Sequence, residues 1–393
     1  MTNVLVLYDR WNPSVQLSLR FLRTMADGVV SLACVKVTEV TSKYLNEADI
    51  VISIRGNDKL TFRIASTARK NGKIFVVMAD DNLAELPREA VVDPSRKKQF
   101  KRILHIADYV IADTEILAKR LCQIGETDKY VLFNALVEDD SCVSPPPVSA
   151  NQKIVYAAGR NHEELFDSYV KPALERVVKR DRKHSFSLHC VGVDPNLEDF
   201  SGVLDVYVHP HMDMDAYHKF MEESKYTIGV APLHDDDFCK YKYFNKYIEY
   251  ARMGIVGVYS NCLPFNLIVT NGVNGLLCGN SAEEWATAIN TLLEDDQLRV
   301  DIARNAQKVL CERFNPIQVR RVFLESFPLF TSYKASEKSE ISQFKIEFYI
   351  ALHAAWRVKE RIVLAALLLR RRGFVGLYKK LLSMLTGRQN ERR

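Results

Sequence analysis

The chain has 393 residues, of which 47% are hydrophobic and 26% are charged, and its formal net charge is +5. This length is sufficient for two globular domains with full cores and an additional tail. The eight cysteines are scattered, with no C-x-x-C pair and no cluster with histidine, which argues against a disulfide or zinc framework and predicts a reduced, cytoplasmic protein.

The N-terminus begins at once with a strand pattern, MTNVLVLYDR, so we expect no signal peptide. No run of eighteen apolar residues occurs, which predicts that no segment spans a bilayer. The positive charge is concentrated at the C-terminus, since residues 357–393 contain eleven Arg or Lys and two Glu. The remainder of the chain is therefore slightly acidic.

The first half alternates short apolar runs with helical segments, which predicts a parallel, doubly wound α/β sheet. The expected strands are residues 4–8, 29–37, 50–54, 74–78, 109–112 and 130–133. Ligands bind such sheets beyond the carboxyl ends of the strands. The loops expected to line one cleft are Asp9-Arg10, Arg55-Gly56-Asn57 and Asp80-Asp81.

Asp80 and Asp81 follow the fourth of these strands and are candidates for a general base. The alternative is a local role, because Asp favours strand ends and helix caps. Two adjacent carboxylates without a further acidic residue or His nearby are too few for a magnesium or manganese site. No metal is therefore expected.

A proline-rich connector separates the two halves, with three consecutive prolines at 145–147 that favour an extended, semi-rigid chain. We place a first domain at 1–137, the linker at 138–150, a second domain at 151–328 and a tail at 329–393. The second half repeats the alternation, with strands expected at 153–157, 186–191, 203–208, 226–230, 255–259 and 276–278.

The stretch 238–275 reads as helix, tight turn and buried strand, with Gly254 as the stop signal. Lys242, Lys246 and Glu249 are spaced by four and three residues, which places them on one face of the expected helix. Two ammonium groups near a helix start suit a diphosphate, and the carboxylate one turn further suits a ribose diol. The alternative is an ordinary surface ion pair.

This stretch resembles the nucleotide-sugar end of group 1 glycosyltransferases, in their bacterial polysaccharide branch. The positions in step with that pattern are Phe238, Lys242, Lys246, Tyr247, Glu249, Tyr250, Gly254 and Ile255. The resemblance continues through GVNGLL (272–277), EEWATAI (283–289) and LLEDDQLR (292–299). It is weaker in the first half, where residues 78–83, 107–118 and 133–135 are similar but the glycine-rich turn after the first strand is replaced by YDRWNP.

The resemblance implies the GT-B fold, in which two Rossmann-like domains face one cleft. It implies a donor diphosphate site of Arg160, Lys242 and Lys246, with Glu249 on the ribose. It adds Pro232, Leu233 and Tyr247 as the base or sugar pocket, and His162, from a GRNH turn, beside Asp80 and Asp81 as catalytic candidates. Arg160 and His162 have a plain surface turn as their alternative. The usual E-x7-E pair is incomplete, because Tyr241 stands where its first glutamate is expected.

The tail is expected to form a polar linker, a helix over 344–369, a break at 370–373 and an amphipathic helix over 374–385. Basic residues beside an apolar face suit an anionic membrane surface, so 344–385 is our expected membrane contact. Packing on the protein's own domain or another subunit is the alternative, and nucleic acid is disfavoured because the basic residues interleave with aliphatic ones.

Together these features predict a cytoplasmic glycosyltransferase, peripheral on the inner face of the cell membrane. It would use a nucleoside diphosphate sugar without a metal or other cofactor, and a glycan or lipid-linked acceptor in surface polysaccharide synthesis. Retention of configuration is expected from the resemblance alone. The alternatives are a non-catalytic GT-B partner of another transferase and a nucleotide-sugar epimerase.

Overall fold

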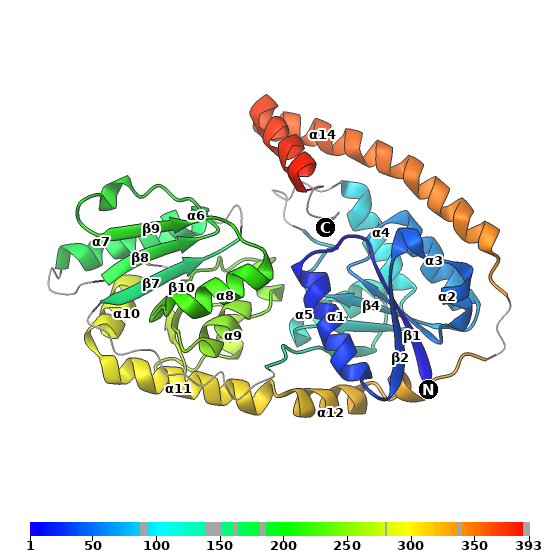
Figure 1. Cartoon of the computed structure of the whole chain (residues 1–393), viewed down its shortest axis with the longest axis horizontal. Coiled ribbons are helices and arrows are strands. Elements are labelled where there is room, and N and C mark those ends of the chain that lie inside the picture. The colour runs from blue at the N-terminus through cyan, green and yellow to red at the C-terminus, as the bar shows by residue number, and fades with distance from the viewer. Residues whose placement is uncertain are drawn as a thin grey trace. The chain divides into compact units, whose positions relative to one another are not determined.

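The protein was analysed as a computed structural model, which describes residues 1–86, 93–137, 151–159, 163–180, 186–279, 281–336 and 340–387. The chain divides into two compact units (Figure 1). Unit 1 contains Met1–Phe133 together with Phe323–Arg393, and unit 2 contains Asn134–Val322. The C-terminal region, which the sequence analysis set apart as a tail, thus groups with the first half. The proline-rich linker lies outside the described residues.

Unit 1 is built on a six-stranded parallel sheet in the order β2-β1-β3-β4-β5-β6. Its strands are β1 (Thr2–Tyr8), β2 (Val30–Lys36), β3 (Ile50–Ile54), β4 (Ile74–Ala79), β5 (Tyr109–Ala112) and β6 (Tyr130–Leu132). β3 and β4 are buried along their whole length, as expected for continuous apolar runs covered on both faces. The strand order reverses between β1 and β3, and ligands bind doubly wound sheets at such a point.

The helices of unit 1 begin where a polar side chain can cap them. Helices α1 (Pro13–Ala26), α3 (Lys59–Lys70), α4 (Pro94–His105) and α5 (Glu115–Gly125) follow caps whose side chains accept backbone N–H bonds. These caps are Asn12, Asp58, Asp93 and Thr114. The short helix α2 (Ser42–Glu47) completes the first part of the unit.

Unit 2 repeats the design, with a parallel sheet in the order β12-β11-β10-β7-β8-β9. Its strands are β7 (Gln152–Ala157), β8 (Phe186–Val191), β9 (Asp205–His209), β10 (Ile228–Ala231), β11 (Val256–Ser260) and β12 (Leu276–Cys278). Its helices are α6 (Glu163–Leu165), α7 (Lys171–Arg180), α8 (Met214–Ser224), α9 (Asn245–Arg252), α10 (Ala282–Glu294) and α11 (Asp296–Arg313). The order reverses between β7 and β10, which is the corresponding ligand-binding position.

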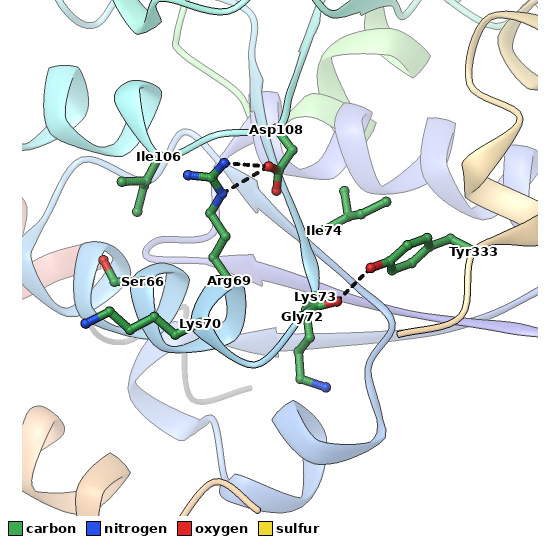
Figure 2. Close-up of a pocket in the computed structure, with 9 residues that line it drawn as sticks. All are labelled: Ser66, Arg69, Lys70, Gly72, Lys73, Ile74, Ile106, Asp108 and Tyr333. Atoms are coloured by element: carbon green, nitrogen blue, oxygen red, sulfur yellow. Dashed lines mark hydrogen bonds and ion pairs between the residues drawn. The ribbon is translucent and has the colours of Figure 1, made fainter. Parts of the chain in front are cut away.

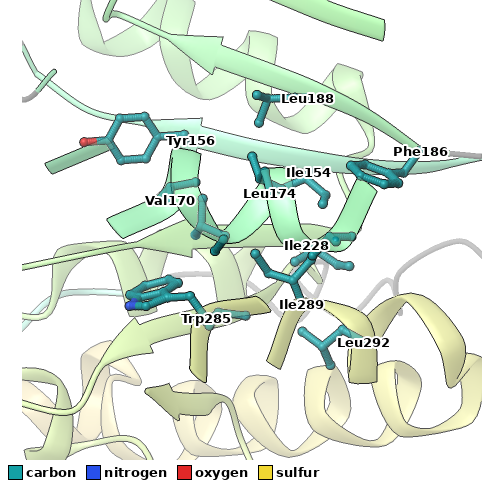
Figure 3. Packing of buried hydrophobic residues seen from close by; sticks show 14 of the residues in the cluster. Ile154, Tyr156, Val170, Leu174, Phe186, Leu188, Ile228, Trp285, Ile289 and Leu292 are labelled. Carbon is teal, nitrogen blue, oxygen red and sulfur yellow. The ribbon is translucent and has the colours of Figure 1, made fainter. Parts of the chain in front are cut away.

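The core of unit 2 lies between one face of the sheet and helices α7 and α10 (Figure 3). Ile154 and Ile228 from adjacent strands meet Leu174 of α7 and Trp285 of α10, and none of these side chains has measurable exposure. Packing of this kind holds the loops at the strand ends in fixed positions. The fold class expected from the sequence, two doubly wound α/β units with a helical C-terminus, is confirmed.

The C-terminal region differs from the expected tail. After α12 (Pro316–Ser326) and α13 (Leu329–Ser332), one helix, α14 (Gln343–Gly387), runs through the positions 370–373 where we expected a break. A single glycine within a long helix costs only about 1 kcal/mol, too little to end it. Among the described residues, no helix is both long enough and apolar enough to cross a membrane.

The segment before α14 is attached to unit 1 instead of forming a free linker. The Tyr333 hydroxyl donates to the Gly72 carbonyl at 2.7 Å, and the Lys334 ammonium lies 2.9 Å from the Asp49 carboxylate. Ile341 exchanges two hydrogen bonds with the Asn46 side chain, at 2.9 and 3.3 Å. Helix α14 then packs along α2 and α3.

Candidate functional site

Helix α9 and helix α8 bring three polar side chains together in unit 2. The Lys246 ammonium donates to Glu249 Oε2 at 2.6 Å and to the Tyr217 hydroxyl at 3.0 Å. That hydroxyl in turn donates to the same Glu249 oxygen at 3.0 Å. The Lys246 and Glu249 side chains are 26% and 23% exposed, so the pair is reachable from solvent while remaining largely surrounded by protein.

The charges of this group support one another. Burial by itself lowers the pKa of Lys246, but the Glu249 carboxylate outweighs that effect and raises the pKa of the ammonium. Burial, with the neighbouring Glu249 carboxylate, raises the pKa of Tyr217, so its hydroxyl stays protonated and serves as a donor. The aromatic rings of Tyr217 and Tyr250 lie 5.1 and 6.0 Å from the ammonium and add cation–π attraction. Lys246 is therefore a fixed cation.

Lys242 does not lie on the same helix, contrary to the sequence analysis. Helix α9 begins at Asn245, and a single 3-10 turn, Cys239–Tyr241, precedes it. The turn forms because the Asp236 carboxylate accepts the backbone N–H groups of Phe238 and Cys239 at 2.9 and 2.7 Å. Lys242 extends from the end of this turn, with its ammonium 5.1 Å from the centre of the Phe238 ring.

Tyr247 was expected in the base or sugar pocket, but it lies in the core with no exposed surface. Its hydroxyl accepts a hydrogen bond from the Asn274 side chain at 3.0 Å, and that side chain also donates to the Ile268 carbonyl. Because a fully enclosed ring cannot touch a donor without rearrangement, Tyr247 has a packing role. Its hydrogen bond to Asn274 holds the GVNG loop in place. This gives a structural reason for the GVNG motif, which the sequence alone did not supply.

The loops at the carboxyl ends of β10 and β11 are tied together next to the point where the strand order reverses. The Leu233 backbone N–H donates to the Ser260 hydroxyl at 2.9 Å, and both Pro232 and Leu233 are buried. The next residue, His234, meets the Tyr169 hydroxyl through its Nδ1 at 3.1 Å. Pro232 and Leu233 thus lie beneath the surface at this edge of the sheet. His234 and Tyr169 are polar residues at the same edge that were not predicted from the sequence.

Arg160 and His162 lie outside the described residues. The structure does describe the end of the preceding strand, β7, which finishes at Ala157 and is followed by Ala158 and an exposed Gly159. This strand end lies beside β10 at the reversal of strand order. The assignment of Arg160 and His162 to the donor and catalytic sites remains a prediction.

In unit 1, Asp80 and Asp81 at the end of β4 both contact Arg55 at the end of β3. Arg55 Nη1 donates to Asp80 Oδ1, to Asp81 Oδ2 at 3.0 Å and to the Ser14 hydroxyl at 3.2 Å. Although burial alone lowers its pKa, the two carboxylates outweigh that and raise the pKa of Arg55. Arg55 has a left-handed φ of 53°, which is unusual for a side chain of this size. Two of the loops expected at one edge of the sheet, Arg55-Gly56-Asn57 and Asp80-Asp81, are thus brought together with the start of α1.

A third carboxylate, Asp113 at the end of β5, faces the same edge and was missed by the sequence analysis. It is 5% exposed, and its Oδ1 makes no hydrogen bond within the part of the chain that the structure describes. Burial, with the negative charges of Asp80 and Asp81, raises the pKa of Asp113 well above its ordinary value. Within the described ranges, no group of three or more His, Cys, Asp or Glu is arranged to hold a metal ion.

A cavity of about 560 Å³ lies at the opposite edge of the same sheet (Figure 2). It is lined by Ser66, Arg69, Lys70, Gly72, Lys73, Ile74, Ile106, Asp108 and Tyr333. Arg69 is paired with Asp108 through two of its nitrogens, at 3.0 and 2.9 Å. These residues stand at the amino ends of β4 and β5, away from the strand ends that carry the candidate site.

Residues 152–295 match the family model described as "Glycosyl transferases group 1". The match lies within unit 2 and spans the Lys246, Glu249 and Tyr217 group and the β10 loop. No curated protein matches the sequence. The match agrees with the family resemblance noted in the sequence, whereas nothing in it singles out the polysaccharide branch.

Several solved structures share the two-unit fold. Anabaena HepE, in a complex with UDP, is 16% identical over 83% of this chain and 100% of its own, with a TM-score of 0.58. A sucrose-phosphate synthase from Thermosynechococcus elongatus is 13% identical over 84% of this chain and 98% of its own, with a TM-score of 0.59. The lipopolysaccharide outer core galactosyltransferase WaaB is 16% identical over 83% and 99%, with a TM-score of 0.54. At these identities the likeness establishes the GT-B fold.

Proposed function

We propose that this protein is a glycosyltransferase that moves a sugar from a nucleoside diphosphate donor to a hydroxyl group of a glycan or lipid-linked acceptor. The observation that carries the proposal is the Lys246, Glu249 and Tyr217 group, which lies inside the segment matched by the group 1 family model. The solved relatives of the same fold include complexes with UDP and with UDP-glucose, which supports a nucleotide-sugar donor.

The donor site we propose uses the two charges of α9 separately. Lys246, with Lys242 and Arg160, would neutralise the diphosphate as it leaves, and Glu249 would accept hydrogen bonds from the ribose diol. Without a donor, each charge satisfies the other at 2.6 Å, which avoids leaving a half-buried ion unpaired. Tyr217 holds both groups in either state, since its hydroxyl contacts the ammonium and the carboxylate.

The acceptor side is proposed for the carboxyl edge of unit 1. Asp80 and Asp81, oriented by Arg55, are the candidates to receive the proton of the attacking hydroxyl, and His162 is a candidate from unit 2. We propose transfer without a metal ion and with retention of configuration, both on the strength of the family resemblance. The pathway we propose is surface polysaccharide assembly at the inner face of the cell membrane, with α14 as a peripheral membrane contact.

The first experiment is a thermal-shift panel of the full-length protein against UDP, GDP, ADP, CMP and dTDP. A ligand that binds only the folded form raises its apparent stability by mass action, by about 2.7 kcal/mol at a concentration of 100 Kd. We expect a rise in melting temperature with one nucleoside diphosphate that is lost in Glu249→Ala. Glu312→Ala, which removes an exposed ion pair on α11, is the matched control and should keep the shift.

A protein that binds a nucleotide sugar without releasing the nucleoside diphosphate would be the non-catalytic partner. Conversion of the nucleotide sugar to its epimer, with no acceptor consumed and no net release of nucleoside diphosphate, would identify the epimerase. If no nucleotide in the panel raises the melting temperature of the wild-type protein, the donor-site proposal is wrong.

Chelation is expected to leave sugar transfer unchanged. The diphosphate charge would be met by Lys246 and its neighbours, so removal of divalent cations should change the initial rate by less than about twofold. The measurement is nucleoside diphosphate release with and without EDTA after dialysis. A complete loss of activity that magnesium or manganese restores would contradict the metal-free mechanism.

A further inference from the structure

Helix α14 buries an unusual set of residues against unit 1. The residues of its inner face that are at least nine-tenths buried include Ile346, His353, Trp356 and Glu360, with exposures of 0%, 3%, 9% and 2%. Their spacings of seven, three and four residues place them on one side of the helix. Two of the four are polar or charged, so this buried side is less apolar than the inner face of an ordinary surface helix.

The opposite side of α14 carries a continuous apolar stripe. We define the outer stripe as Phe344, Phe348, Leu352, Val358 and Ile362, which are exposed by 78%, 52%, 37%, 59% and 66%. At 1.5 Å per residue, it extends about 27 Å along the helix. The small residues Ala351 and Ala355 lie between its members and are also exposed. A contiguous exposed apolar strip of this length marks an interaction surface.

The rotation of the helix is fixed by the inner face, so the exposure of the stripe is not a result of loose docking. Arg96 of α4 pairs with Glu360 through two nitrogens and lies 5.3 Å above the Trp356 ring. His353 Nδ1 lies 3.6 Å from the buried Asp58 carboxylate. Turning the outer stripe inward would separate the buried Arg96 and Glu360 charges, which carries a large free-energy penalty.

The positive charge of α14 indicates what kind of partner binds the outer stripe. Between residues 344 and 387 the sequence has nine Lys or Arg and two Glu, and Lys345, Lys359 and Arg361 are exposed beside the stripe. A second copy of the helix on the stripe would bring two strongly positive segments together, which is unfavourable. A nucleic acid would leave the Phe, Val and Ile side chains uncovered. An anionic lipid surface matches both the apolar stripe and the positive flanks.

We propose that the outer stripe of α14 lies on the surface of an anionic lipid bilayer, with the helix parallel to the membrane plane. This inference adds to the proposed function. What it implies for a lipid-linked acceptor rests on that function. The inner face reaches the ligand edge of unit 1, because Arg96 also contacts Asn57 at 2.5 Å and Asp9 at 3.4 Å. The helix would thereby hold the proposed acceptor edge next to the leaflet in which a lipid-linked acceptor resides.

The test is flotation of the full-length protein with vesicles of phosphatidylcholine alone or with 30% phosphatidylglycerol, a composition chosen as about that of a moderately anionic membrane. We expect binding to the anionic vesicles, weakened by salt, and little binding to the neutral ones. The triple variant Phe348→Glu, Val358→Glu, Ile362→Glu should reduce the bound fraction by about tenfold or more. Ile317→Glu, at an apolar residue on α12 that is 81% exposed, is the control and should bind like wild type.

Two outcomes would overturn the proposal. The first is that the triple variant binds vesicles as wild type does, whereas a variant with Arg370→Gln, Arg371→Gln and Arg372→Gln does not bind. That result would mean that the basic residues after the stripe, and not the stripe itself, bind the membrane. The second is a wild-type dimer that the triple variant converts to a monomer without loss of vesicle binding. Nucleotide-induced thermal shifts should be equal in the wild type and the triple variant, so failure of the membrane proposal and failure of the donor site are separable.

Discussion

Replacement of Glu249 by glutamine should lower kcat/KM for sugar transfer by about 100-fold or more, with no loss of folded structure. The carboxylate accepts both the Lys246 ammonium at 2.6 Å and the Tyr217 hydroxyl at 3.0 Å. Glutamine keeps the size of the side chain but removes its charge. It therefore weakens the acceptor proposed for the ribose and leaves the ammonium without its counter-charge.

The experiment is a double-mutant cycle of Glu249→Gln and Lys246→Met, with nucleoside diphosphate release and circular dichroism measured for each protein. Because the two groups share the proposed donor, the losses should be strongly non-additive. Glu312→Gln on α11 is the control. It removes an exposed carboxylate that pairs with Lys308 four residues earlier on its helix, and it should retain wild-type activity. Full activity in both single variants would show that the donor site lies elsewhere.

The sheets of both units could be predicted because buried parallel strands leave a strong local signal. β3, β4 and β11 are short apolar runs in which every residue is buried. The pairing of Lys246 with Glu249 was also accessible, since residues three apart on a helix are neighbours whatever surrounds them. Periodicity therefore predicts those parts of the fold and the site that depend on residues close together in the sequence.

The features that were missed depend on contacts between distant parts of the chain. Lys242 lies outside helix α9 because the Asp236 carboxylate stabilises a separate turn that precedes the helix. Tyr217 joins Glu249 from another helix, and nothing in its local sequence indicates that contact. Tyr247 has a hydroxyl group, as a residue of a polar pocket would, yet that hydroxyl accepts its hydrogen bond from Asn274 inside the core.

The C-terminal region shows the same limit more strongly. An apolar stripe on a helix ordinarily predicts the buried side, and by that rule the outer stripe of α14 would face the protein. The buried side is instead selected by two residues of unit 1. Arg96 pairs with Glu360, and the Asp58 carboxylate lies 3.6 Å from His353 Nδ1. Because these partners lie far away in the sequence, periodicity alone could not give the orientation of the helix.

Replacement of Glu360 by alanine should destabilise unit 1 by about 3–5 kcal/mol, because it leaves the buried Arg96 guanidinium without its principal counter-charge. Burial by itself raises the pKa of Glu360, but its hydrogen bond to Arg96 outweighs that and lowers the pKa below its ordinary value. The unfolded chain then binds the proton more readily, so this stabilisation is complete above about pH 4.3 and is lost as the pH falls further.

Hydrogen exchange measured by mass spectrometry can resolve this effect, since it reports the two units separately where a single melting temperature would not. Protection should fall in α3, α4 and α14 of the Glu360→Ala protein and stay unchanged in the sheet of unit 2. The difference from wild type should narrow as the pH is lowered through the depressed pKa of Glu360, because the wild-type carboxylate is then protonated as well. Glu347→Ala is the matched control, at an exposed glutamate on the same helix. Equal protection in these two variants would mean that the Arg96 and Glu360 pair does not hold α14, and the fixed outward orientation of its apolar stripe would lose its physical basis.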